Sequence, residues 1–335
     1  ILSLVSLAAY ILTKVSVTVY AGALVFSTLL PDTFGSPQNA FWFGAIATVV
    51  LTGIYTVAGG LRAVLYTDSV QAIVLLIGSV AITYFGLDRL GGWNELRGFA
   101  SENVAQYALW RPLSDPDFPW LGLLIASPIV GIWYWCTDQY IVQRTLAAKD
   151  LKTARRGALW GAFLKVWPVL FFLVPGLIGA ALNAKGLLAI PTKADGALSG
   201  DQVFPTMVAS LLPEGLRGLV VAGMMAALMS SLSSLFNSTA TLFTVDVYDK
   251  LRPGASEMQL VTVGRIATLI VVILGLAWIP VMPMISKGGL YQYLQSVQGY
   301  LAPPITAVFL LGVFNSRINN RGAVWGLGLG FVLGM

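Results

Sequence analysis

The sequence contains no histidine and a single cysteine, and only 10% of its 335 residues are charged. The absence of histidine removes the side chain that most often serves as general base, metal ligand and proton relay. The lone Cys136 excludes an intrachain disulfide and a thiolate metal cluster. A serine nucleophile would have no histidine to activate it, so we expect that the protein is not an enzyme. Soluble domains are normally about 25% charged, which excludes an ordinary soluble protein.

Long apolar segments make up most of the chain. Hydrophobic residues account for 57% of it, and its 35 glycines are typical of closely packed membrane helices. A helix crosses a bilayer with about 20 apolar residues. This criterion predicts nine spans, at 2–29, 40–58, 68–88, 119–143, 157–182, 217–245, 260–282, 292–314 and 322–335. We therefore expect an all-α polytopic membrane protein in which residues 1–335 form one domain.

The two ends of the chain lie inside apolar segments, so we expect an internal fragment, with its last span truncated. Basic residues predict the orientation. The loops 59–66, 144–156, 249–265 and 315–321 hold eleven lysines and arginines, whereas the opposite, longer loops hold seven. The basic side is expected to face the cytoplasm, which puts the long loops 89–118 and 183–216 outside. The net charge of +5 lies mostly in these short inner loops, so we expect no nucleic-acid partner.

Residues 133–145 carry an unusual density of polar and aromatic side chains for a membrane helix. Such groups are costly in lipid, so this segment is expected to line a polar path. Tyr134 and Trp135 offer faces for an apolar ligand surface such as that of a sugar ring, although an interfacial aromatic belt is the alternative. Hydroxyl ligands could bond to Gln139, Lys165 and Gln295. Lys14, Lys165, Asp68, Asp138 and Asp246 are intramembrane or membrane-edge charges, which are functional candidates unless they are paired or reach the interface.

A row of hydroxyls follows one face of the segment 217–245. Ala227, Ser230 and Ser231 have the spacing i, i+3, i+4, which places them on one side of a helix. Oxygen ligands suit hard cations, and the absence of a carboxylate cage favours a monovalent ion. The alternative is a stripe of small residues that packs against another helix.

Several motifs together resemble the sodium/solute symporter family, and within it the sodium/glucose cotransporter branch. They are Gly60-Leu-Arg-Ala-Val-Leu-Tyr-Thr-Asp68, Trp133-Tyr-Trp-Cys-Thr-Asp-Gln139, Gln143-Arg-Thr-Leu-Ala-Ala-Lys149, Ser230-Ser-Leu-Ser-Ser-Leu-Phe-Asn-Ser238 and Tyr300-Leu-Ala-Pro-Pro304. The resemblance implies a LeuT-like inverted-repeat transporter core. Within it, this chain would run from the third core helix to just past the tenth and would lack the N-terminal helices.

The resemblance also implies ligands. Ala227, through its carbonyl, with Ser230 and Ser231, resembles half of the main sodium site. Asp68 with Ser233 and Ser234 resembles a second sodium region. Sugar-hydroxyl ligands would be Lys165, Gln295 and Lys14, while Tyr134 resembles an inner gate beside Trp135, and Tyr291 an outer gate. Gly131 departs from the family, because relatives carry a polar residue there.

The function that these features imply is sodium-coupled import of a monosaccharide such as glucose or galactose by alternating access, with Na+ as the only cofactor. The partners would be a small sugar, sodium and the lipid bilayer. The alternatives are a sodium symporter for myo-inositol or another small solute, and a sugar-gated sensor or channel without sugar flux. The outer loops lack the cysteines of animal relatives, which favours a plasma membrane of bacterial type, the inner membrane.

Overall fold

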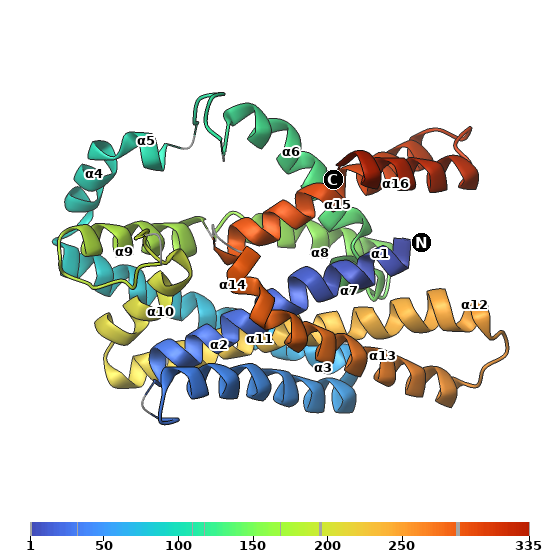
Figure 1. Cartoon of the computed structure of the whole chain (residues 1–335), viewed down its shortest axis with the longest axis horizontal. Coiled ribbons are helices and arrows are strands. Elements are labelled where there is room, and N and C mark those ends of the chain that lie inside the picture. The colour runs from blue at the N-terminus through green and yellow to red at the C-terminus, as the bar shows by residue number, and fades with distance from the viewer. Residues whose placement is uncertain are drawn as a thin grey trace.

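The computed structural model describes residues 2–31, 33–108, 110–116, 118–167, 169–193, 196–285 and 289–334, without the side chains of 57–64, 106, 283 and 285. Within these residues the regular secondary structure is helical, apart from two isolated β-bridges. Figure 1 shows the helices α2, α3, α11 and α13 side by side along the long axis, with α15 and α16 above them.

Several of the α-helices are interrupted or followed by short segments of π-helix or 3-10 helix. In order they are α1 (Leu2–Ala9), η1 (Tyr10–Val15), α2 (Ser16–Leu29), α3 (Pro37–Leu90), α4 (Trp93–Glu102), α5 (Val104–Tyr107), α6 (Trp120–Ile132), η2 (Trp133–Thr137), α7 (Gln139–Leu146), α8 (Leu151–Leu164), η3 (Val169–Leu173), α9 (Val174–Ala184), α10 (Gly200–Leu211), α11 (Glu214–Phe243), η4 (Thr244–Tyr248), α12 (Asp249–Leu251), α13 (Glu257–Trp278), η5 (Ile279–Val281), α14 (Met282–Ile285), α15 (Leu290–Phe314) and α16 (Asn320–Gly334). The segments η1 to η4 are π-helices, and η5 is a 3-10 helix.

Eight helical stretches in the described residues are long and apolar enough to cross a membrane, and they coincide with the first eight predicted spans. The ninth predicted segment forms α16, whose 15 residues are too few for a full span. The two long segments predicted to lie outside contain helices, because 89–118 includes α4 and α5, and 183–216 includes α10. An ion pair between Lys185 and Glu95 joins these two segments.

Helix α3 differs from expectation, because its 54 residues include the predicted inner loop 59–66 and the two predicted spans on either side. The side chains at 57–64, including Arg62, and the residue Lys287 lie outside the described part. A straight helix of this length would be about 80 Å long. However, Tyr55 of α3 donates to the carbonyl of Met229 of α11, and Gly78 of α3 packs against Val220 of α11. These two contacts are 23 residues apart on α3 but only nine residues apart on α11. Helix α3 is therefore not straight and bends back along α11.

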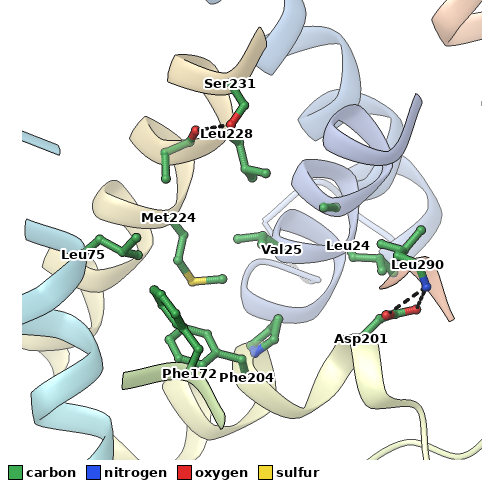
Figure 2. A pocket seen from close by; sticks show the side chains of 13 residues that line it. Leu24, Val25, Leu75, Phe172, Asp201, Phe204, Met224, Leu228, Ser231 and Leu290 are labelled. Atoms are coloured by element: carbon green, nitrogen blue, oxygen red, sulfur yellow. Dashed lines mark hydrogen bonds between the residues drawn. The ribbon is translucent and has the colours of Figure 1, made fainter. Parts of the chain in front are cut away.

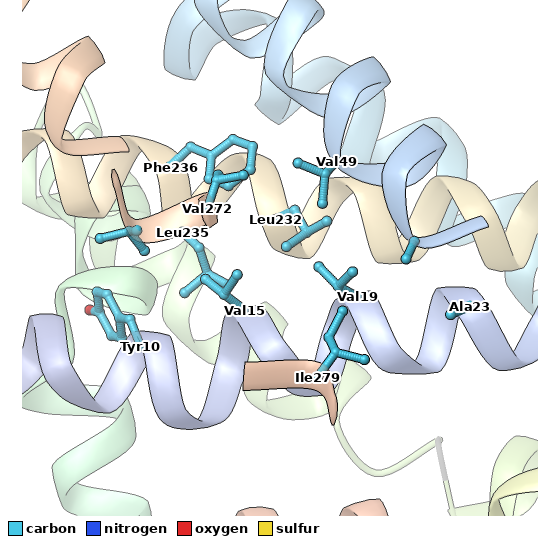
Figure 3. Packing of buried hydrophobic residues seen from close by; sticks show 12 residues of the cluster. Tyr10, Val15, Val19, Ala23, Val49, Leu232, Leu235, Phe236, Val272 and Ile279 are labelled. Atoms are coloured by element: carbon cyan, nitrogen blue, oxygen red, sulfur yellow. The ribbon is translucent and has the colours of Figure 1, made fainter. Parts of the chain in front are cut away.

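The first core cluster joins η1, α2, α3, α11 and α13. Figure 3 shows Val19 of α2 and Leu232 of α11 pointing into the layer between these helices, with Val49 of α3 beside them. Helices in lipid approach closely where one side chain is small. Gly275 of α13 is such a position, because a Cβ there would overlap the side chain of Val15. This packing holds η1, which carries Lys14, against α13 and so positions the polar residues described next.

Candidate functional site

A cavity of about 140 Å³, which we call the central cavity, lies where the six helical segments η1, α2, η2, α7, α11 and α15 meet. Its chemically informative lining residues are Lys14 of η1, Tyr134 of η2, Tyr140 of α7, Ser231 of α11 and Gln298 of α15. Lys14, Tyr134 and Ser231 were predicted as site residues from the sequence. The structure therefore places a predicted cation ligand and two predicted sugar contacts around one cavity.

A break between two helical segments positions the side chains of Tyr134 and Tyr140. The π-helix η2 ends at Thr137, and Asp138 then takes an extended conformation before α7 begins. The wider turn is held by the amide of Asp138, which donates to the carbonyl of Trp133 over 3.1 Å. Asp138 caps α7 by accepting from the amide of Tyr140 at 3.2 Å. Interrupted helices at membrane depth are tolerated where they line a cavity, which is the situation here.

Lys14 and Asp138 form an ion pair across this break. Only 9% of the lysine side chain and 2% of the aspartate side chain are exposed. The hydroxyl of Tyr10 donates to the other carboxylate oxygen at 2.6 Å. Four aromatic rings surround the ammonium group, with centroid distances of 4.3 Å to Tyr140, 4.9 Å to Tyr10, 5.2 Å to Tyr134 and 5.7 Å to Trp133. A buried charge needs such compensation, so the cation is stabilised at the cavity wall.

The predicted sodium ligands lie on α11, beside this cavity. The hydroxyl of Ser231 donates to the carbonyl of Ala227 over 3.2 Å, and the carbonyl of Ser230 accepts from Ser234 at 3.0 Å. Ser231 and Ala227 also line a second, mainly apolar cavity of about 350 Å³. Figure 2 shows this apolar cavity with Ser231 at one end and Asp201 at the other. Ser231 therefore lines both cavities. Its hydroxyl and the carbonyl of Ala227 are hard oxygen ligands of the kind that a monovalent cation prefers.

The predicted second cation region contains a guanidinium group. Arg144 of α7 donates to Asp68 Oδ2 at 2.8 Å and to Ser234 Oγ at 2.6 Å. Ser233 lies in the same turn of α11 and is fully buried, donating to the carbonyl of Ser230 at 2.8 Å. Asp68, Ser233 and Ser234 were predicted from the sequence, whereas the hydrogen bonds from Arg144 to Asp68 and Ser234 were not.

Other predicted ligands lie on exposed surface in this structure. Gln295 donates to the hydroxyl of Tyr291 at 3.1 Å, and Trp135 makes an edge contact with Tyr134 at 5.8 Å. Lys165 follows the end of α8 and is also exposed, whereas Gln139, the first residue of α7, is half-buried. The structure does not bring Lys165 or Gln295 into the lining of the central cavity. Their roles as sugar ligands stay predictions.

Of the five lining residues named above, Tyr140 and Gln298 were not predicted from the sequence. Gln298 is 7% exposed and lies three residues after Gln295, so both are on neighbouring turns of one helix. Tyr140 follows the capping Asp138 by two residues. The available signal was the spacing, because a residue three positions from a predicted ligand shares its side of a helix.

Comparison with known proteins finds relatives that match nearly the whole of this chain. A family model described as "Sodium:solute symporter family" matches residues 1–330. Sodium/glucose cotransporter 4 of Danio rerio is 39% identical over 358 residues, covering 100% of this chain and 53% of the relative. Sodium/myo-inositol cotransporter 2 of Homo sapiens is 40% identical, covering 100% and 52%, and a sodium/mannose cotransporter of Bos taurus is 40% identical, covering 99% and 58%. The chain thus spans about half the length of these relatives.

A solved structure of a Na+-coupled sialic acid symporter in a substrate-bound outward-open state has a similar fold, with a TM-score of 0.79. The sequence identity is 23%, and the match covers 98% of this chain and 67% of the other. This likeness confirms the predicted LeuT-like transporter fold.

Proposed function

Because the chain belongs to the sodium:solute symporter family, we propose that the protein imports a monosaccharide such as glucose or galactose together with sodium by alternating access. It is a multi-pass membrane protein, and sodium is the coupling ion of its family. The relatives are cotransporters, as expected for a transport protein rather than an enzyme. The choice of a sugar and the order of events are our proposals.

The observation that carries the proposal is the composition of the central cavity. A sugar has hydroxyl groups around an apolar C–H face. Tyr134 offers a flat apolar surface for that face, and Lys14 and Gln298 offer donors for the hydroxyls. Ser231, a proposed sodium ligand, contributes to the same wall, so that an ion bound there would adjoin the sugar.

In the proposed cycle, sodium binds first to the carbonyl of Ala227 and the hydroxyls of Ser230 and Ser231. Sugar then binds against Tyr134, with Tyr291 as the outer gate and Tyr134 as the inner gate. Sodium leaves toward the cytoplasm past Asp68, and the sugar follows. The membrane potential supplies about 2.3 kcal/mol per charge per 100 mV. This corresponds to roughly fiftyfold accumulation for one ion, since 1.4 kcal/mol is about tenfold.

Uptake of labelled galactose and glucose into proteoliposomes tests the proposal, with an inward sodium gradient compared with an equal potassium gradient. We expect sodium-dependent accumulation above equilibrium. Uptake of labelled mannose and myo-inositol is measured in the same way, because relatives named for these solutes are as similar as the glucose cotransporter. If only myo-inositol accumulates, the second candidate, a polyol symporter, replaces the first. A sodium current without labelled-sugar accumulation would identify a sensor or channel.

The location that fits this function is the plasma membrane. The basic loops predict that α4, α5 and α10 lie outside the cell. In a bacterial cell the corresponding location is the inner membrane. Labelling of a cysteine introduced at Lys185 with a membrane-impermeant thiol reagent in intact cells tests the orientation, and protection from the reagent would contradict it.

A further inference from the structure

Arg144 lies at the intersection of three helices, in the region predicted to hold a second cation. Its guanidinium donates to Asp68 of α3, to Ser234 of α11 and to the carbonyl of Tyr140 in its own helix α7, the last at 3.1 Å. The side chain of Arg144 is 28% exposed and that of Asp68 is 20% exposed. The contact is therefore partly shielded from water, and its geometry is that of a charge-assisted pair.

The acceptors around Arg144 are not fully used. Asp68 Oδ1 is buried and has no hydrogen-bond partner. A buried carboxylate oxygen without a partner is costly, so this atom favours a further cation or donor. Ser234 Oγ accepts from the same guanidinium nitrogen, Nη2, that donates to Asp68 Oδ2. Carboxylate, hydroxyl and carbonyl oxygens are the ligands that small hard cations prefer.

We propose that the guanidinium of Arg144 and a sodium ion compete for Asp68 and Ser234, so that Arg144 acts as a tethered counter-ion that sets the sodium affinity of this region. The inference rests on the proposed function only in taking sodium as the ion. Two cations that share one carboxylate repel each other, so sodium enters when Arg144 moves away. With the region empty, the pair prevents an uncompensated negative charge at Asp68.

The competition also reaches the central cavity. Arg144 contacts the carbonyl of Tyr140, and its guanidinium lies 5.7 Å from the Tyr140 ring. Tyr140 in turn lines the cavity and lies over the ammonium of Lys14. Displacement of Arg144 by an ion therefore changes contacts of a residue that adjoins the proposed sugar position.

Binding of radioactive sodium to the purified protein in lipid nanodiscs tests the competition without requiring sugar flux. Arg144→Gln should lower the half-saturating sodium concentration of the Asp68 region about tenfold, the change that a lost competitor worth 1.4 kcal/mol produces. Arg144→Lys keeps the charge but loses the planar fork, so its shift should be smaller. Adding Asp68→Asn should abolish the gain of Arg144→Gln. Arg156→Gln, an exposed position on α8, is the control and should bind sodium like the unmodified protein.

Chemical rescue gives a second test that does not depend on comparing stabilities. Free guanidinium ion at millimolar concentration should compete with sodium in Arg144→Gln and not in the unmodified protein. Unchanged or weaker sodium binding in Arg144→Gln would overturn the inference, as would a gain that persists with Asp68→Asn. If Arg144→Gln does not fold, an Arg144→Lys protein whose sodium affinity equals that of the unmodified protein would also overturn the inference. Sodium binding that shifts as expected in a protein that takes up no sugar would contradict the proposed function alone.

Discussion

Asp138→Asn separates the charge of the buried ion pair from the other roles of this residue. Asparagine is as good an N-cap as aspartate, so the start of α7 at Gln139 should be preserved. The substitution removes the negative charge beside Lys14, and the ammonium group then lies buried without its counter-ion. The change therefore measures what the ion pair contributes to the fold around the central cavity.

The size of the effect follows from burial. Breaking a buried pair by removing one partner costs about 3–5 kcal/mol. The four rings around Lys14 still attract the cation in the variant, and an aromatic face contributes up to about 2 kcal/mol. We expect the lower end of the range, about 3 kcal/mol. The double variant Lys14→Met with Asp138→Asn has no buried charge, so it should recover most of this loss.

Thermal unfolding of the purified protein in detergent, followed by the loss of its monodisperse chromatographic peak, measures the changes. Lys185→Met is the matched control, because it breaks the ion pair with Glu95, whose side chains are 38% and 52% exposed. An exposed pair contributes at most about 1 kcal/mol. Its loss should therefore lower the melting temperature much less than Asp138→Asn does.

The reasoning is refuted by either of two results. One is an Asp138→Asn protein that unfolds at the temperature of the Lys185→Met control. The other is a double variant whose loss equals the sum of the losses of Lys14→Met and Asp138→Asn, because side chains that are coupled should deviate from additivity by about 0.5–3 kcal/mol.

Four further predictions concern single substitutions. Ser231→Ala should raise the sodium concentration for half-maximal uptake about tenfold, the effect of losing one contact of about 1.4 kcal/mol, and Ser231→Thr is the control that keeps the hydroxyl. Gln298→Ala should raise the half-saturating sugar concentration with little change in sodium dependence, measured as uptake at fixed sodium. Asp201→Ala should lower the free energy of unfolding by about 1–2 kcal/mol, because the carboxylate accepts from the first amide of α15 at 3.1 and 3.2 Å, which thermal unfolding would detect. The Lys185 ammonium holds the pKa of Glu95 below its usual range, so Lys185→Ala should slightly lower the melting temperature at pH 7, and this difference should disappear as the pH falls through that lowered pKa.

The number and position of the long helices could be predicted because lipid leaves few options to the backbone. A chain in hydrocarbon must satisfy its own amides, so apolar length alone predicts a span. The reversal of the chain between the spans predicted at 40–58 and 68–88 follows from the same reasoning. Apolar length did not predict that α3 continues as a helix through the loop expected at 59–66.

The candidate site was predictable residue by residue but not as a set of contacts. Lys14 and Asp138 were each recognised as charges that need a partner, yet 124 positions separate them, and spacing does not indicate that they pair. Gln298 was missed because the rotation of α15 decides which glutamine faces the cavity. The guanidinium at Asp68 was missed because no local pattern relates α7 to α3.

The π-helical turn of η2 has a consequence for how an aromatic side chain can leave the cavity. A π turn holds one residue more than an α turn, and one residue corresponds to about 100° of rotation around a helix axis. If the segment Trp133–Thr137 rewound as an α-helix, the side chains of the rewound turn would swing by about that angle relative to the helix that follows. Tyr134 could then be removed from the cavity by a local change of winding, without tilting α6 or α7 as rigid rods.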